Sequence, residues 1–133
     1  MSEKTQRLEI VTPQRVAFKD DARFVVVPGV EGELGFLPDH APLVSALKEG
    51  VLRVQKDGNT TSVALHGGFV EVRDSRVTVL ANAAERSDEI DMSRAEEAKK
   101  RAEERLAAKS QDVDLQRAES ALRRALTRLN VSG

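Results

Sequence analysis

The sequence predicts two domains in series: an antiparallel β-sandwich, or flattened barrel, followed by an antiparallel two-helix hairpin. All 4 prolines, all 4 phenylalanines and every glycine except Gly133 lie before Ser75. Residues 87–132 contain no Gly, Pro or aromatic residue and are rich in Ala, Leu, Arg, Lys and Glu, which favour helices. We therefore expect a β-sandwich domain over 1–86 and a helical hairpin domain over 87–133.

Short alternating or β-branched segments indicate the strands of the sandwich. Their expected bounds are 7–11, 23–27, 51–55, 60–65, 69–72 and 76–80. Asp57-Gly58 predicts a hairpin turn, because this pair readily adopts the positive φ angles of a two-residue loop. No long helical pattern separates the segments, which disfavours a parallel α/β sheet. Asp20-Asp21 is interpreted as a turn, and the glycine-rich segment 29–35 as a turn or a protein contact.

Two apolar stripes at helical spacing predict the hairpin. They are Ala95, Ala98, Ala102 and Leu106 in the first helix, and Leu115, Ala118, Leu122, Ala125, Leu126 and Leu129 in the second. Asp88 or Asp91 is expected to cap the first helix, and residues 109–112 form the break between the two. Because narrow, alanine-rich faces bury little surface, we expect the pair to be able to detach from the sandwich without unfolding it.

Composition excludes several function classes. The 133 residues include 21 Lys and Arg against 22 Asp and Glu, so a wide basic surface for duplex nucleic acid is not expected. Aromatic residues make up 3%, too few for a platform that stacks single-stranded bases. The absence of cysteine excludes thiol catalysis and cysteine-bound zinc. Without an apolar run of membrane-spanning length or a signal peptide, a soluble protein on the cytoplasmic side is expected.

The sequence also lacks the usual catalytic patterns. His40 and His66 are the only histidines and do not have metal-ligand spacing, so no metal site is predicted. No nucleophile elbow, phosphate-binding loop or dinucleotide fingerprint is present. The glycine-rich segment 29–35 carries two carboxylates, which would repel phosphate. We expect no catalytic residue.

Two rows of arginines are the main candidates for binding. Arg94, Arg101 and Arg105 share a face of the first helix, and Arg117, Arg124 and Arg128 repeat this spacing on the second. One interpretation is a solvated face that pairs with Glu97, Glu104 and Glu119. The other is that the rows converge on a polyanion or an acidic partner, since guanidinium groups bind phosphate and carboxylate in bidentate fashion. Composition alone leaves both open.

A long motif resembles a known family. Residues 31–43, EGELGFLPDHAPL, are similar to the EGELG-x-x-P-x-H-x-P-L signature of the ε subunits of F-type ATP synthase. Residues 67–72 and 77–81 resemble the hairpin and the strand that follow it in that family, and the resemblance covers essentially the whole chain in order. It implies a non-catalytic subunit of the rotating central stalk, which couples the c-ring to rotation.

The resemblance also implies partners and interface residues. The sandwich would contact the γ subunit and the membrane-embedded c-ring, with Glu31 near the ring. The expected γ contact consists of Pro38, His40, Pro42 and Leu43. The chain would be peripheral at the cytoplasmic face of the cell membrane, held there only through the complex, and would bind no nucleic acid.

In this family the helical hairpin is a regulator that can extend along γ into the catalytic α/β head and obstruct ATP hydrolysis. Basic residues would then meet acidic segments of the head; the candidates are Arg101, Arg105, Arg117, Arg123, Arg124 and Arg128. Some bacterial members bind ATP in the folded state through the motif I/L-D-x-x-R-A, which residues 90–95 match. The implied ATP site comprises Glu85, Ile90, Asp91, Arg94, Ala95, Arg101, Arg124 and Arg128. ATP would be a regulatory ligand that favours the folded state.

Two alternatives remain at this point. The chain could be a free-standing β-sandwich adaptor whose basic hairpin binds an acidic protein without nucleotide. It could also be a small nucleotide-sensing protein that acts alone. A stable complex with a γ partner would distinguish a stalk subunit from both.

Overall fold

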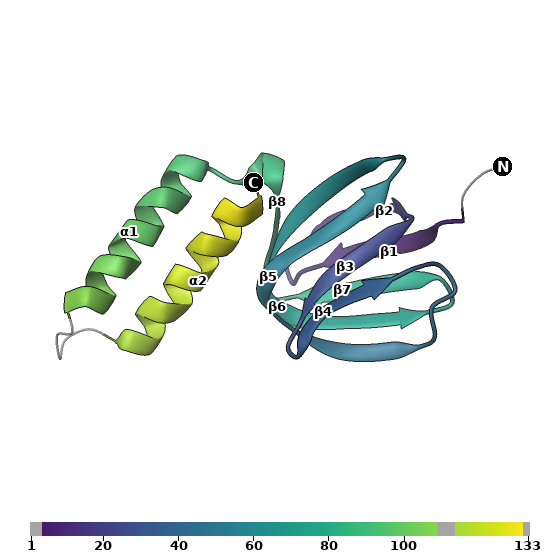
Figure 1. Ribbon diagram of the computed structural model, residues 1–133, viewed down its shortest axis with the longest axis horizontal. Helices are drawn as coiled ribbons and strands as arrows, with labels where there is room; N and C mark the ends of the chain where they lie inside the picture. Colours follow the sequence, from purple (N-terminus) through teal and green to yellow (C-terminus); the bar gives the residue numbers. More distant parts are fainter. Residues whose placement is uncertain (1–3, 109–113, 132–133) are drawn as a thin grey trace.

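The computed structural model describes residues 4–108 and 114–131, which form a β-sandwich followed by two helices (Figure 1). The strands are β1 (Gln6–Val11), β2 (Val16–Ala22), β3 (Phe24–Gly29), β4 (Gly32–Phe36), β5 (Leu43–Lys56), β6 (Asn59–Arg73), β7 (Arg76–Ala81) and β8 (Ala84–Arg86). A single 3-10 turn, η1 (Ser87–Glu89), leads to α1 (Met92–Ala108) and α2 (Leu115–Val131). The predicted fold class is confirmed.

The strands form one continuous but unclosed sheet that folds over on itself. Its order is β2-β1-β7-β6-β5-β3-β4, with β8 paired to β6. Strands β1 and β7 run parallel, and the other described pairs are antiparallel. Apolar side chains from both layers fill the space between them, among them Leu8, Ile10, Val25, Phe36, Leu52, Val63, Val70 and Val79.

The bend in β6 makes this folding-over possible. The register between β5 and β6 is the same on both sides of this bend, and the pairing is interrupted only at Lys48 and Gly67. Gly67 and Gly68 have φ angles of 78° and 138°, which L side chains rarely adopt. A Cβ atom at Gly68 would also overlap the carbonyl oxygen of Leu80. The paired glycines therefore turn β6 from its pairing with β8 to its pairing with β7.

One turn prediction was wrong, and another was right only in part. Asp20-Asp21 lies inside β2, where Asp20 accepts a hydrogen bond from Lys56 Nζ (2.8 Å) and Asp21 accepts one from Arg7 (3.3 Å). Cross-strand cations thus stabilise a pair of acidic residues that local propensity assigns to a turn. The glycine-rich segment 29–35 contains the predicted turn at 30–31, but its residues 32–35 belong to β4, which pairs with β3. The segments 60–65 and 69–72 belong to a single strand, β6.

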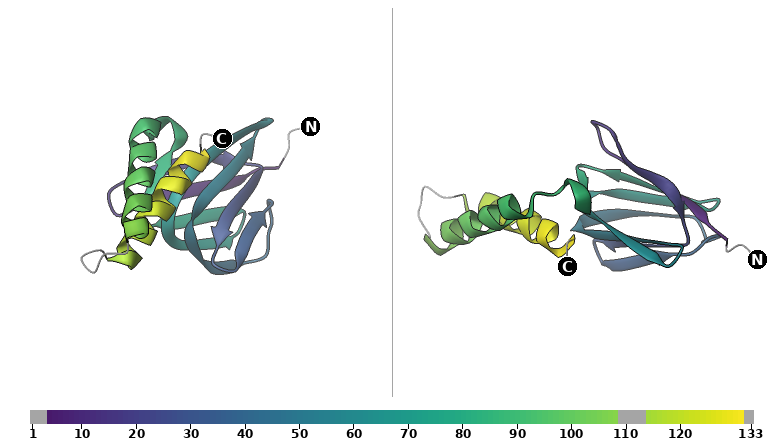
Figure 2. Two further views of the ribbon diagram at one scale, coloured as in Figure 1. Left: turned by 60° about the vertical axis from the view of Figure 1, so that its left-hand side comes forward. Right: turned by 90° about the horizontal axis from the view of Figure 1, so that it is seen from above.

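The two helices pack on each other, and α2 contacts β5 and β6 (Figures 1 and 2). Their contact is lined by buried alanines, namely Ala95, Ala102, Ala118 and Ala125. Asp91 caps α1, since its carboxylate accepts a hydrogen bond from the backbone N–H of Arg94 (3.1 Å). Leu115 and Leu126 of the predicted second stripe are exposed, whereas Thr127 and Val131 are buried.

The break expected at 109–112 lies outside the described residues. Of the helices that the structure describes, none has the length and apolarity required to cross a membrane.

Candidate functional site

A cavity of about 450 Å³ lies at the junction between the sandwich and the helices. Its walls come from β8, η1, the segment after η1, α1 and the end of α2; they comprise Glu85, Glu89, Ile90, Asp91, Arg94, Ala95, Ala98, Arg101 and Arg128. Of the eight residues predicted for an ATP site, the structure brings seven to this cavity. Arg124 is the exception, because it lies one helical turn before Arg128 and is not among the lining residues.

Three arginines from two helices face the cavity. Arg94 and Arg101 are two turns apart on α1, and Arg128 reaches it from α2. The solvated-face interpretation requires ion pairs between the helix arginines and Glu97, Glu104 or Glu119. Within residues 4–108 and 114–131, no such ion pair is present. Over the same ranges, the guanidinium groups of Arg94 and Arg101 have no carboxylate partner. They are therefore available to an anionic ligand.

Glu85 occupies the centre of a polar network at the junction. Its Oε1 atom accepts hydrogen bonds from Arg128 Nε (2.7 Å) and His66 Nε2 (2.9 Å). Burial alone would raise the pKa of Glu85, but the hydrogen bonds and positive charges of Arg128 and His66 outweigh it and lower the pKa. Glu85 is thus an ionised carboxylate, and its bond to Arg128 links the sandwich to α2.

Glu89 is held by a residue far away in the sequence. Arg15, in the turn between β1 and β2, donates two hydrogen bonds to the Glu89 carboxylate, at 2.7 and 3.1 Å. The hydrogen bond and charge of Arg15 lower the pKa of Glu89. Arg15 also donates to the carbonyl oxygen of Ala84 (3.0 Å), so it ties η1 to β8. Arg15 thereby neutralises the negative charge of Glu89 from the side of Glu89 that faces away from the cavity.

His66 lies behind Glu85 and is almost completely buried, with 6% of its side chain exposed. Its Nδ1 atom is 2.6 Å from Glu49 Oε2, and its Nε2 atom is the one that meets Glu85. Burial favours the neutral ring, but the hydrogen bond and charge of Glu49 and the hydrogen bond of Glu85 outweigh it, and also outweigh the repulsion from Arg128. The pKa of His66 is consequently raised above its ordinary value of 6.5.

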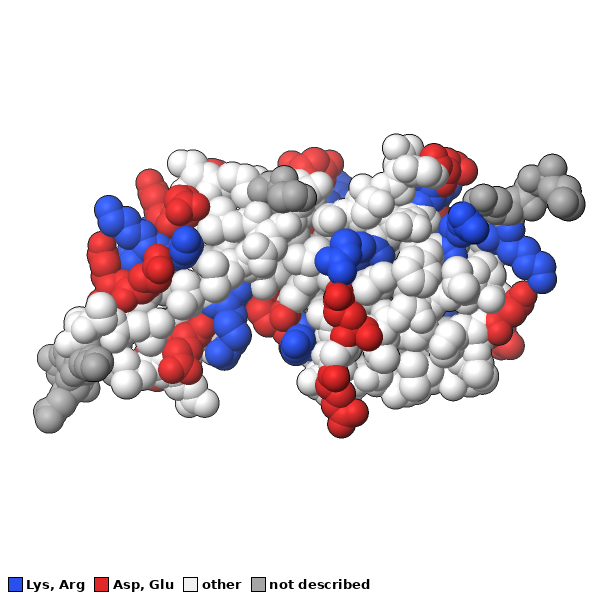
Figure 3. All heavy atoms as spheres, in the orientation of Figure 1, with Lys and Arg blue, Asp and Glu red and all other residues white. Residues whose placement is uncertain are grey.

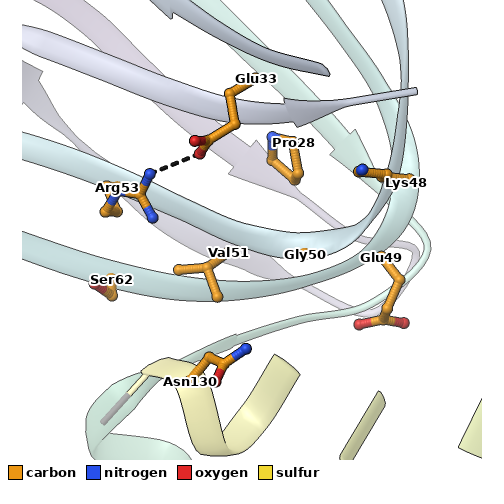
Figure 4. Close-up of a pocket in the computed structure, with 9 residues that line it drawn as sticks. All are labelled: Pro28, Glu33, Lys48, Glu49, Gly50, Val51, Arg53, Ser62 and Asn130. Carbon is orange, nitrogen blue, oxygen red and sulfur yellow. Dashed lines mark hydrogen bonds and ion pairs between the residues drawn. The ribbon is translucent and has the colours of Figure 1, made fainter. Parts of the chain in front are cut away.

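A second cavity, of about 470 Å³, lies on the other side of Glu49 (Figure 4). It is lined by Pro28, Glu33, Lys48, Glu49, Gly50, Val51, Arg53, Ser62 and Asn130. Arg53 and Glu33 form an ion pair across it (2.6 Å), and Asn130 closes it from α2. Glu49 therefore connects this second cavity to the buried His66.

The predicted interface residues lie at opposite ends of β4. Glu31 is exposed in the turn before this strand, and residues 38–43 follow it. Because five strand residues span about 17 Å, the two groups are separated by about that distance. The ring of His40 is exposed and packs edge-on against Phe36, with ring centroids 5.1 Å apart, while Leu43 packs against the core.

An exposed apolar row crosses the sheet from β1 to β5. Register places Val11 beside Leu80, Leu80 beside Phe69, and Phe69 beside Ala46. Phe69 and Leu80 are 57% and 56% exposed, and Val44, two residues from Ala46 on the same face of β5, is 68% exposed. In the view of Figure 3, charged side chains gather on the helices, at the junction and around the rim of the sandwich. An uncharged row on a sheet face is typical of a protein contact.

Comparison with known families decides the identity. The model described as "ATP synthase, Delta/Epsilon chain, beta-sandwich domain" matches residues 5–87, and its "long alpha-helix domain" partner matches residues 88–133. The chain belongs to this family. As an ATP synthase epsilon-type chain it is an accessory subunit, and the catalytic sites of the enzyme lie on other chains.

Curated epsilon chains are similar over most or all of their length. The ATP synthase epsilon chain of Pelotomaculum thermopropionicum is 66% identical over 133 residues, covering 100% of this chain and 99% of the relative. That of Desulforudis audaxviator is 63% identical over 108 residues, covering 81% and 79%.

Solved structures show the same fold at low identity. A chain of the Euglena gracilis mitochondrial ATP synthase, from a structure of its OSCP, F1 and c-ring, matches with a TM-score of 0.80 at 24% identity, covering 99% of this chain and 84% of that one. A chain of the Tetrahymena thermophila mitochondrial ATP synthase, from its central stalk and c-ring, matches with a TM-score of 0.57 at 14% identity, covering 98% and 96%.

Sequence reasoning missed several groups in this epsilon-type chain. Glu89 and Ala98 also line the junction cavity, and Arg15, Glu49 and His66 stand behind it. His66 had one local signal, since it follows a strongly apolar strand segment, but it was considered only as a metal ligand. For the apolar row, the signal was the presence of Phe69 and Leu80 at positions where the alternation calls for polar side chains.

Proposed function

We propose that this chain is a rotor subunit in the central stalk of an F-type ATP synthase, and that ATP bound at the junction cavity regulates its helices. The family match supports the stalk role, as does the similarity in fold to a chain from a central stalk and c-ring. In this proposal the sandwich attaches to γ and the c-ring, and couples proton-driven ring rotation to the catalytic head. The chain would then be peripheral at the cytoplasmic face of the membrane.

ATP is the ligand that the cavity chemistry favours. The triphosphate would lie against Arg94, Arg101 and Arg128, whose guanidinium groups form charge-assisted hydrogen bonds with phosphate oxygens. Glu85, Asp91 and the backbone near Ile90 would contact the ribose or the base, and Ala95 and Ala98 leave room beside α1. The volume of about 450 Å³ is that of an ordinary small-molecule site. Arg124 would add charge from one turn away.

The observation that carries this proposal is the convergence of arginines from both helices on one cavity. A ligand that bridges α1, α2 and β8 binds only while the helices are folded, so it shifts the population toward that state. Without ATP, the helices would extend along γ toward the α/β head and restrain hydrolysis. Arg101, Arg105, Arg117, Arg123, Arg124 and Arg128 would then contact acidic partner segments.

Docking would use the sandwich alone. The apolar row through Phe69 and Leu80 suits the γ subunit, because a buried interface core needs apolar area with a polar rim. Residues 38–43, including Pro38, His40 and Pro42, would extend the γ contact from the end of β4, whereas Glu31 at its other end would face the c-ring.

The alternative is an adaptor whose basic helices bind an acidic protein without nucleotide. Exposed arginines outside the cavity, such as Arg105 and Arg117, fit that alternative equally well. The cavity does not favour that alternative, since an acidic segment of another protein does not require a pocket enclosed by three elements.

Equilibrium titration of the full chain with ATP tests the proposal. We expect ATP to bind at up to millimolar concentration, and Arg94→Ala to weaken binding about 10- to 100-fold, because one charge-assisted hydrogen bond contributes about 1.5–3 kcal/mol. Arg117→Ala is the matched control: an exposed helix arginine outside the cavity, which should bind as the unaltered chain does. Absence of any ATP signal would refute the nucleotide site and leave the stalk role standing.

A further inference from the structure

The contacts of His66 fix its protonation state. Both ring nitrogens lie within hydrogen-bond distance of a carboxylate oxygen, Nδ1 of Glu49 at 2.6 Å and Nε2 of Glu85 at 2.9 Å. A neutral imidazole has one N–H, so one of these contacts would set a lone pair against a carboxylate. An imidazolium donates in both directions and removes the conflict. The buried ring is therefore cationic while both carboxylates are ionised.

The fold places the three groups together through strand register. Glu49 of β5 pairs directly with His66 of β6, and Glu85 of β8 pairs with Ala64 two residues before it. Because side chains alternate along a strand, Ala64 and His66 point away from the core that receives Val63 and Leu65. They point toward the face of β6 that α2 covers.

The charge of His66 matters for the cavity wall. The lining residues carry three carboxylates, Glu85, Glu89 and Asp91, and three arginines, Arg94, Arg101 and Arg128. On their own these charges cancel, and the wall would not attract a polyanion. Behind the wall stand two cations and one carboxylate: Arg15 contacts Glu89, and His66 lies between Glu85 and Glu49. With these groups included, five cations stand against four carboxylates, a net charge of +1. Arg94 and Arg101, which have no carboxylate partner among the described residues, are left to bind phosphate.

We propose that His66 is a positioning residue for nucleotide: as an imidazolium held by Glu49, it fixes the Glu85 carboxylate and keeps the cluster that it forms with Glu49, Glu85 and Arg128 neutral, so that polyphosphate binding weakens as the pH rises. The inference rests on the proposed nucleotide site. The groups that face His66 are Glu49 from β5, Glu85 from β8 and Arg128 from α2. Glu49 also lines the second cavity, where Lys48, Arg53 and Glu33 are the other charged groups and solvent can reach its carboxylate (Figure 4).

Loss of the proton would act in two ways. The cluster of Glu49, His66, Glu85 and Arg128 would change from neutral to a net charge of −1 beside the phosphate site. One of the two carboxylates, Glu49 or Glu85, would also face an imidazole lone pair and move away. When Glu85 moves, the ligand loses one of its contacts. Both effects disfavour ATP, and by linkage bound ATP must raise the pKa of His66.

The test measures ATP binding by the full chain between about pH 7 and 9, where the terminal phosphate is already ionised. We expect affinity to fall with rising pH, by at most tenfold per unit for one proton. His66→Gln, which cannot ionise, should bind ATP at least about fivefold more weakly at pH 7 and show a flatter pH profile. His40→Gln, altered at the exposed histidine, should keep the profile of the unaltered chain.

Glu49→Gln supplies a second variant that leaves every residue of the nucleotide cavity in place. Removing the charge opposite Nδ1 lowers the pKa of His66, so the fall in affinity should begin at a lower pH. The ring proton resonances of His66, followed with and without ATP, should show a higher pKa in the complex.

The outcomes separate the two proposals. If the unaltered chain binds ATP and His66→Gln retains both its affinity and its pH profile, the positioning role is wrong and the nucleotide site stands. If ATP leaves the His66 titration unchanged, the positioning role is likewise wrong. If the unaltered chain fails to bind ATP at any pH, both proposals fall together.

Discussion

The sandwich and the helix pair bury their residues by different means. The sandwich core consists of large apolar side chains such as Phe36, Leu8 and Ile10, each contributing about 1.5–3 kcal/mol on burial. The helices bury mainly alanines, and a buried methyl or methylene group contributes only about 0.8 kcal/mol. One chain therefore contains a rigid domain and a weakly held one. This difference is what a subunit with a fixed attachment and a movable regulator requires.

The largest effect is expected from the core of the sandwich. Phe36→Ala should lower the free energy of unfolding by about 3–5 kcal/mol, because it removes a ring that is 1% exposed and leaves a cavity. Denaturant unfolding, followed by the amide signals of the strands, measures this cost. As the comparison within the helices, Ala125→Gly should cost about 1 kcal/mol and leave the strand signals unchanged. Simultaneous melting of strands and helices in Ala125→Gly would contradict the two-unit description.

An intermediate effect is expected at the contact between the two units. Arg128→Met removes the bond to Glu85, so the helices should open about 1–3 kcal/mol more easily without ligand. Hydrogen exchange at the α2 amides measures this, and Arg117→Met on the same helix should leave exchange unchanged. Since the folded chain lowers the pKa of Glu85, its contribution is present above its ordinary pKa and is lost as the pH falls through the lowered value. Faster exchange in strands of the core as well would contradict a local opening.

The smallest effect on folding is expected at the apolar row. Phe69→Ser should change stability by less than about 1 kcal/mol, because its side chain is already 57% exposed. Binding to a purified γ subunit should nevertheless weaken by about 2 kcal/mol or more, as for an aromatic residue at an interface centre. Val30→Ser, at an exposed apolar position in the β3–β4 turn, is the control and should bind γ normally. Equal binding by Phe69→Ser and Val30→Ser would exclude the row as the γ contact.

The parts of the fold that local sequence determines were predictable. Glycine and proline placement and helical periodicity gave the division into strands and helices, and Asp91 was one of two candidates for the α1 cap. Strand β2 could not be predicted, because Asp20 and Asp21 are stabilised there by Lys56 and Arg7 from other strands. The continuous course of β6 was also hidden, since its bend depends on a close approach to β7 that involves Gly68.

The candidate site divides in the same way. Residues 90–95 form a contiguous motif, so the start of α1 could be located from sequence, together with its arginine at 94. Glu49 and His66 reach the site through strand pairing, and Arg15 reaches it from the turn between β1 and β2. Their separations of 74 residues (Arg15 to Glu89), 17 (Glu49 to His66) and 19 (His66 to Glu85) leave no local pattern. The resemblance implied both Arg124 and Arg128; they lie one turn apart along α2, and only Arg128 lines the cavity.

The short strand β8 limits how far the regulator can travel. Five residues, 87–91, separate its end from the start of α1, and stretched out fully they span about 17 Å. Within that radius the helices can swing while β8 stays in place. A larger displacement requires the three residues of β8 to separate from β6, which breaks their strand pairing and moves Glu85 away from His66. The linker between sandwich and helices thus has two lengths, one with β8 paired and one with β8 released. Glu85, which helps to keep β8 paired, also lines the nucleotide cavity.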